Sequence, residues 1–88
     1  MRNLIPDYMI GGIDRWIDHG IPPGDFLMAV LCNNLKEAVA RADDVNVKLL
    51  PAYVSFFYND APSECWGSPE KVLAWKLKME LKAAGATT

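Results

Sequence analysis

The 88-residue sequence has little of what marks a catalytic or metal-binding protein. It contains one histidine, His19, and two cysteines, Cys32 and Cys65, whose separation matches no metal-ligand spacing. A nucleophile needs a base within reach, and no spacing pairs His19 with a cysteine or a serine. No glycine-rich phosphate loop and no pair of carboxylates stands out. We therefore expect a protein that is not an enzyme and has no metal and no cofactor.

Charge of one sign and long apolar runs are also scarce. Nine basic and eleven acidic residues give a formal net charge of −2, too close to neutral for a protein that grips nucleic acid by its phosphates. No stretch is long enough to span a bilayer, and no basic segment precedes an apolar run as in a signal peptide. Two cysteines are too few for a disulfide scaffold. We expect no nucleic-acid partner, no membrane association and an intracellular protein.

Apolar residues, in contrast, are plentiful. They make up 51% of the chain and include three tryptophans, three tyrosines and three phenylalanines. A chain of this length forms one domain and buries only a little over ~60% of its unfolded surface. More apolar surface is present than a small monomer hides easily, and self-association is the usual remedy. The sequence predicts a single domain over residues 1–88 that forms a homo-oligomer.

Helix start and stop signals predict an all-α, four-helix bundle-like fold. Residues 1–6 form an N-terminal arm, and Asp7 is placed to cap a first helix that runs to His19. Gly20 can take the left-handed conformation that ends this helix, and prolines then open a second helix over residues 23–42. Asp43 caps a third helix, and Ser68 caps a fourth, before a frayed tail over residues 85–88. Asn34 is a misfit, because its amide interrupts the apolar stripe of the second helix.

The third segment, residues 45–58, is ambiguous in type. Its end, Tyr53-Val54-Ser55-Phe56-Phe57-Tyr58, has the composition of a strand, and Pro51 interrupts a helix. A single strand among helices has no partner, so we predict a helix interrupted at Pro51. This helix is apolar nearly all round, and the last helix has two apolar faces. The predicted oligomer interface comprises Phe56, Phe57, Trp75, Leu77 and Leu81.

One face of the first helix is the candidate ligand site. Tyr8, Gly12, Arg15 and His19 share this face. Tyr8 can stack on a base, Arg15 can hold a phosphate bidentately, and Gly12, next to Gly11, leaves a gap. Asn33 and Arg41 from a neighbouring subunit can complete the site.

Structural roles compete with this interpretation. Arg15 can instead pair with Asp14, Asp18 or Glu37 at the surface, and His19 can interact with the last carbonyls of its helix. An amide such as Asn33 often bonds to the backbone. Acids in the first turns, Asp25 among them, disfavour phosphate at the helix N-termini, so side chains must hold any phosphate.

Two segments carry a resemblance to a known family. The run 14–42, with its His19-Gly20-Ile21-Pro22-Pro23-Gly24 core, resembles a small uncharacterised accessory protein family of tailed bacteriophages, as does Cys65-Trp66-Gly67-Ser68-Pro69-Glu70-Lys71-Val72. Pro51 departs from the continuous third helix of that family. The resemblance implies a phage gene that acts in the bacterial host cytoplasm, and it implies no reaction.

Many short phage accessory proteins counter host defence, and by this analogy we predict a non-enzymatic binding protein that antagonises antiviral defence. The favoured mechanism is sequestration of a nucleotide immune signal in the manner of a sponge. One alternative is an inhibitor that contacts a host defence protein directly through the last helix. The other is a phage structural or assembly adaptor.

Overall fold

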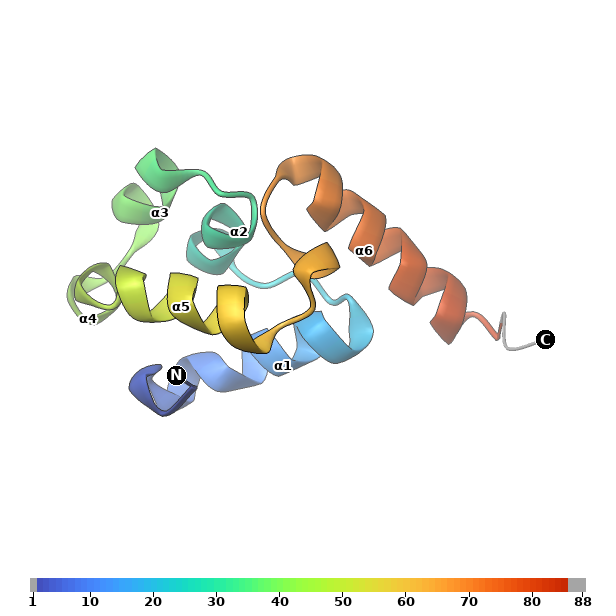
Figure 1. Ribbon diagram of the computed structural model, residues 1–88, viewed down its shortest axis with the longest axis horizontal. Coiled ribbons are helices and arrows are strands. Elements are labelled where there is room, and N and C mark those ends of the chain that lie inside the picture. The colour runs from blue at the N-terminus through green and yellow to red at the C-terminus, as the bar shows by residue number, and fades with distance from the viewer. Residues whose placement is uncertain (1, 86–88) are drawn as a thin grey trace.

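Helices are the only regular structure among residues 2–85, the part of the chain that the computed structural model describes (Figure 1). The predicted all-α class is confirmed, and residues 53–58 are helical despite their strand-like composition. In chain order the elements are the 3-10 turn η1 (Arg2–Leu4), α1 (Asp7–His19), α2 (Asp25–Leu31), α3 (Leu35–Arg41), α4 (Asp44–Lys48), α5 (Leu50–Asp60), the 3-10 turn η2 (Ser63–Cys65) and α6 (Pro69–Ala83).

Helix α1 has the predicted bounds, but its N-terminus differs in detail. Pro6 is the N-cap residue, and Asp7 is instead the first helical residue, where its carboxylate still faces the positive end of the helix dipole. Gly20 ends the helix in the left-handed conformation, with φ 67° and ψ 23°. Its N–H donates to the carbonyl of Trp16 at 2.9 Å. This turn sends the chain away from α1 into residues 21–24, which we call the proline segment.

The prediction of one helix over residues 23–42 is wrong, because the chain turns at Asn33 and Asn34. Asn33 has φ 59°, a left-handed conformation that asparagine tolerates better than most residues. The Asn34 side chain then accepts the N–H of Glu37 at 3.2 Å and caps α3. The amide that interrupts the apolar stripe therefore marks the start of a new helix, and α3 packs back against α2.

The third segment is also two helices, and the chain has six α-helices within residues 2–85 where four were predicted. The interruption lies at Leu49, two residues before Pro51, because proline is tolerated in the first turn of α5. The predicted caps are confirmed on both sides of this region. The Asp43 side chain accepts the N–H of Asn46 at 2.7 Å, and the Ser68 hydroxyl accepts that of Lys71 at 3.1 Å.

Trp16 joins three elements at the centre of the core, where it is 0% exposed. Its indole Nε1 donates to the carbonyl of Cys65 in η2 at 2.9 Å. Its own carbonyl accepts from the indole Nε1 of Trp75 in α6 at 3.0 Å. Both buried indoles thus have the partner that burial demands. These bonds hold η2 and the middle of α6 against α1.

Three of the five predicted interface residues lie in this core. Phe56, Phe57 and Trp75 are 4%, 1% and 5% exposed, so they have little surface left for a partner, and we remove them from the predicted interface. They are buried because α5 crosses the middle of the molecule and α6 turns its Trp75 face toward α1. Leu77 and Leu81, on the other face of α6, are 48% and 64% exposed.

The two ends of the chain differ in how they pack. The predicted arm includes the turn η1, which contacts α5, and Ile5, which is only 3% exposed and anchors the arm to the core, whereas Leu4 is 56% exposed. Of the predicted tail, Gly85 forms a turn after α6, and residues 86–88, like Met1, lie outside the described residues.

None of the helices within residues 2–85 is long and apolar enough to cross a membrane.

Candidate functional site

A pocket of about 450 Å³ lies between α1, the proline segment 21–24, α2 and the chain from Arg41 to Asn46. It brings together four of the six predicted ligand residues, namely Tyr8, Gly12, Arg15 and Arg41. Small-molecule sites occupy roughly 300–1,000 Å³, so this pocket is at the small end of that range. We refer to it as the α1–α2 pocket.

His19 and Asn33 lie outside the α1–α2 pocket. His19 is an exposed residue at the C-terminal end of α1, and the pocket lining stops short of it. Asn33 lines a smaller groove of about 150 Å³ with Val30, Leu50 and Trp66, and its backbone forms the turn between α2 and α3. Asn33 therefore has a structural role in this turn, which its left-handed backbone supplies; the amide that bonds to the backbone is that of the next residue, Asn34.

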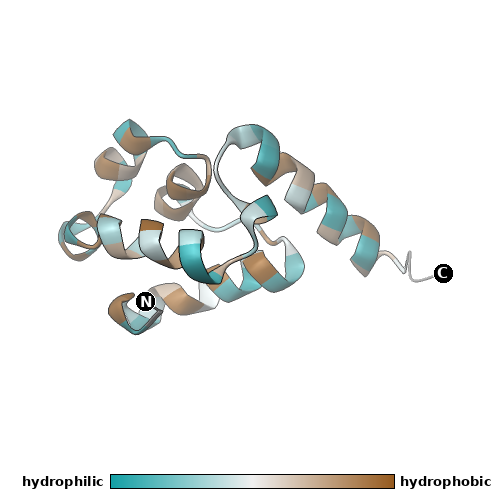
Figure 2. Ribbon diagram, viewed as in Figure 1, coloured by the Kyte–Doolittle hydropathy of each residue, from teal (hydrophilic) through white to brown (hydrophobic). Residues whose placement is uncertain are grey.

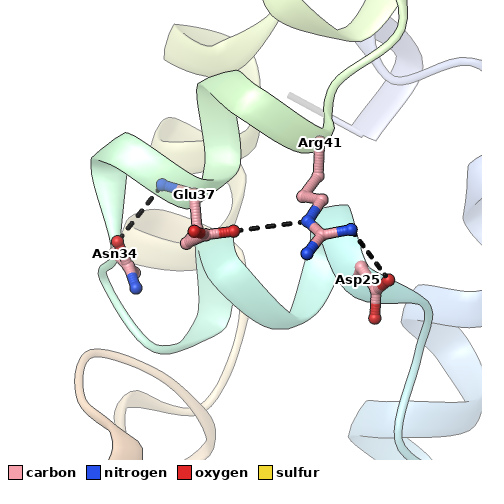
Figure 3. Close-up of polar contacts among 4 residues, drawn as sticks. All are labelled: Asp25, Asn34, Glu37 and Arg41. Atoms are coloured by element: carbon pink, nitrogen blue, oxygen red, sulfur yellow. Dashed lines mark hydrogen bonds and ion pairs between the residues drawn. The ribbon is translucent and has the colours of Figure 1, made fainter.

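Arg41 reaches the pocket from the same chain, and no neighbouring subunit is required. Its Nε lies 3.3 Å from Glu37 Oε2, and its Nη1 lies 3.7 Å from Asp25 Oδ2 (Figure 3). In one continuous helix, the 16 residues between Asp25 and Arg41 would separate them by about 24 Å along the axis. The turn at Asn33 brings the C-terminal end of α3 back beside the start of α2. The assignment of Arg41 to a second subunit is thereby corrected.

Arg15 forms no ion pair and no side-chain hydrogen bond with the described residues, so the predicted alternative partners Asp14, Asp18 and Glu37 do not engage it. Its guanidinium folds back along α1 over the glycine pair. A Cβ at Gly11 would lie 3.1 Å from Arg15 Nη1, and one at Gly12 would lie 3.9 Å from Nη2. The glycines thus leave room for this side chain, whose N–H donors are available to a ligand.

A hydrogen-bonded chain fixes the other end of the pocket. The hydroxyl of Tyr53 donates to Asn46 Oδ1 at 2.5 Å, and Asn46 Nδ2 lies 3.4 Å from the hydroxyl of Tyr8. The Tyr8 hydroxyl donates to Asp43 Oδ2 at 2.8 Å. Asn46 is the one buried polar residue among residues 3–85, at 3% exposed, and its amide is satisfied by these bonds. Tyr8 as a whole residue, in contrast, is 62% exposed.

These contacts set the protonation of the pocket. The hydrogen bond to Asp43 raises the pKa of Tyr8, and burial raises the pKa of Tyr53. The N–H of Asn46, followed by the Tyr8 hydroxyl, lowers the pKa of the Asp43 carboxyl. At neutral pH Asp43 is therefore an anion that holds a protonated Tyr8 in place.

Sequence reasoning missed Asp25, Asp43 and Asn46 as pocket residues. Asp43 was recognised only as a helix cap, and its bond to Tyr8 spans 35 residues of chain, a separation that no local pattern reports. The proline segment 21–24, recognised as helix punctuation, also forms one wall.

The pocket contains two guanidinium groups, from Arg15 and Arg41, and two carboxylates, from Asp25 and Asp43, so its formal charge is close to zero. It offers donors to an anion and acceptors to hydroxyl or amino groups. Within residues 2–85, no group of three His, Cys, Asp or Glu side chains is arranged to hold a metal ion. Comparisons of this chain with protein-family models, with curated proteins and with solved structures give no match.

Proposed function

We propose that this protein binds a nucleotide of low charge in the α1–α2 pocket and retains it without chemical change. The observation that carries the proposal is the guanidinium of Arg15, which has no carboxylate partner among the described residues and faces the same pocket as the exposed residue Tyr8. A planar aromatic ring and a free guanidinium are the two groups that recognise a base and a phosphate.

Each lining group has a role in this proposal. The hydroxyl of Tyr8 is tethered to Asp43, so its ring is held in one orientation and stacks on the base at a low entropic cost. Arg15 donates two parallel N–H bonds to phosphate oxygens. Asp25, already 3.7 Å from Arg41, and Asp43 accept hydrogen bonds from ribose hydroxyls or from the amino group of a base.

The charge and size of the pocket narrow the ligand class. Two carboxylates beside two guanidinium groups disfavour a triphosphate, because its extra negative charges would lie close to Asp25 and Asp43. A cyclic nucleotide carries one negative charge per phosphodiester and matches the near-neutral pocket. The volume of about 450 Å³ suits a single nucleotide unit, either alone or as half of a cyclic dinucleotide.

The biological role follows from the resemblance to a phage accessory family. We propose a phage-encoded binding protein that antagonises host antiviral defence in the bacterial cytoplasm by sequestering a nucleotide immune signal. A sponge needs affinity and no turnover. Sequestration also requires that the protein be abundant relative to the signal.

Thermal unfolding with a ligand panel tests the proposal. The panel contains cyclic mononucleotides, cyclic di- and trinucleotides, ADP-ribose and ATP. A ligand present at about 100 times its Kd adds roughly 2.7 kcal/mol of stability. For a domain of this size each kcal/mol raises the Tm by about 4–8 °C, so a shift of roughly 10–20 °C is expected. Heat denaturation of the complex then releases the nucleotide, and mass spectrometry shows it intact.

Arg15→Ala removes the shift with little change in the Tm of the free protein, since Arg15 forms no ion pair with any residue that the structure describes. Lys36→Ala is the matched control, because it removes an exposed cation outside the pocket and preserves binding. Absence of a shift with every member of the panel would refute the proposal and favour direct contact with a host protein. A cleaved product would refute retention without turnover.

A further inference from the structure

Helix α6 carries an apolar stripe that the rest of the chain leaves uncovered. Leu73, Leu77 and Leu81 are 57%, 48% and 64% exposed and recur every four residues, so they lie on one face. The opposite face contains Val72, Trp75 and Met79, which are buried. The C-terminal half of α6 extends beyond the other helices, and apolar and hydrophilic residues alternate along its whole length (Figures 1 and 2).

We propose that this stripe is the contact surface for a second copy of the chain, with the two α6 helices antiparallel across a two-fold axis at Leu77. Leu73 and Leu81 lie four residues on either side of Leu77. An antiparallel pair centred there therefore places Leu73 of one copy against Leu81 of the other, twice, and Leu77 against itself. A self-complementary patch of this kind is what a symmetric dimer requires.

The charges along α6 agree with an antiparallel arrangement. The two lysines beside Leu77 are already engaged within the chain. Lys76 Nζ lies 2.7 Å from Glu80 Oε2, and Lys78 Nζ lies 3.7 Å from Glu64 Oε2 and 5.1 Å from the centre of a Trp75 ring. Their repulsion across the axis is thereby reduced.

The two ends of the helix carry charges of opposite sign. Glu70 in the first turn and Lys82 in the last turn form no ion pair with the described residues. At about 100° per residue, Glu70 lies about 20° from Leu77 around the helix and so close to the stripe, whereas Lys82 lies about 140° away from it. Antiparallel pairing centred on Leu77 sets the two Glu70 carboxylates 14 residues apart, about 21 Å along the axis. Parallel pairing would instead place Glu70 of one copy against Glu70 of the other. It would also align the two helix dipoles in the same direction, which is unfavourable.

The size of the stripe limits the strength of the dimer. Leu73 and Leu81 are eight residues apart, about 12 Å along the helix. Contacts that bury less than about 1,200 Å² in total are characteristic of weak association. We therefore expect a dimer that forms reversibly as the protein concentration rises. None of the three leucines lines the α1–α2 pocket, so this proposal stands or falls separately from nucleotide binding.

Sedimentation equilibrium of the full chain tests the dimer at concentrations from about 10 μM to about 1 mM, the range that reports weak association. The mass is expected to rise from 9.8 kDa toward twice that value. Leu77→Glu puts two carboxylates face to face at the axis and weakens dimerisation at least about a hundredfold, because like charges across an interface are strongly unfavourable. A wild-type chain that stays monomeric over the whole range overturns the proposal.

A charge exchange tests the antiparallel register. Leu73→Glu alone weakens the dimer. The double variant L73E/L81K dimerises more strongly than L73E/L81E, which loses the same two leucines, because each new carboxylate of L73E/L81K faces a new ammonium group of the other copy. In a parallel pair residue 73 faces residue 73, so L73E/L81K would gain nothing over L73E/L81E, and that result would exclude the antiparallel arrangement. Leu35→Glu is the control, since Leu35 on α3 is 70% exposed and lies off the stripe. An unchanged Tm and helical circular dichroism in each variant confirm that it folds.

Discussion

Gly20→Ala is the substitution that most directly tests how α1 and α6 fit together. Gly20 has φ 67°, where an L-residue with a Cβ is strained. A Cβ at this position would also lie 2.6 Å from the Cβ and 3.1 Å from the Cγ of Met79. The Met79 Cβ is attached directly to the backbone of α6, so the clash cannot be relieved by rotating a side chain. Either α6 moves away from α1 or the turn after α1 changes its path.

The magnitude follows from two separate penalties. The left-handed conformation costs an alanine about 1–2 kcal/mol, and overpacking a well-filled contact costs about 1–3 kcal/mol. A combined loss of about 3 kcal/mol is a large part of the roughly 4–13 kcal/mol expected for 88 residues. It lowers the Tm by roughly 12–24 °C in a domain of this size.

Thermal unfolding followed by circular dichroism and by tryptophan fluorescence measures the effect. Trp16 and Trp75 are joined by a 3.0 Å hydrogen bond across the α1–α6 contact, so their emission reports separation of the two helices. Gly85→Ala is the matched control, because Gly85 also has a positive φ of 84° but has nothing within 4 Å of its Cβ position. A Gly20→Ala protein within about 0.5 kcal/mol of the wild type would refute this account of the contact.

Three further outcomes are expected. Asn34→Ala removes the cap of α3 and lowers the free energy of unfolding by about 1 kcal/mol, which a shift of the urea midpoint measures and an unchanged midpoint contradicts. The N–H of Asn46 lowers the pKa of Asp43 below its ordinary value of 3.8, so this carboxylate stabilises the fold above that pH. This stability is lost as the pH falls through the lowered pKa, and Tm measurements from about pH 6 to about pH 2 should decline less for Asp43→Asn than for the wild type. Burial raises the pKa of Cys65 to about 11, so a thiol reagent near neutral pH should modify only Cys32 in the folded protein, and modification of both would contradict the burial.

The sequence by itself determined the class of the fold and most of its helix ends. The start and stop of α1, the left-handed Gly20 and the caps at Asp43 and Ser68 depend on contacts within a few residues of each other. Local capping energies of about 1 kcal/mol select these conformations, and local patterns therefore report them. The face that carries Tyr8 and Arg15 was predicted for the same reason.

Contacts between distant residues decided the rest. From the sequence alone, the amide of Asn34 fits either an interruption within one helix or the N-cap of a second helix. The packing of α3 against α2 selects the N-cap. That turn brings Arg41 beside Asp25, and the bond from Tyr8 to Asp43 joins residues 35 positions apart. The burial of Phe57 and Trp75 and the exposure of Leu77 likewise depend on where α5 and α6 pack. The apolar character of a residue favours burial, but the tertiary structure decides which apolar residues are buried and which partners they pack against.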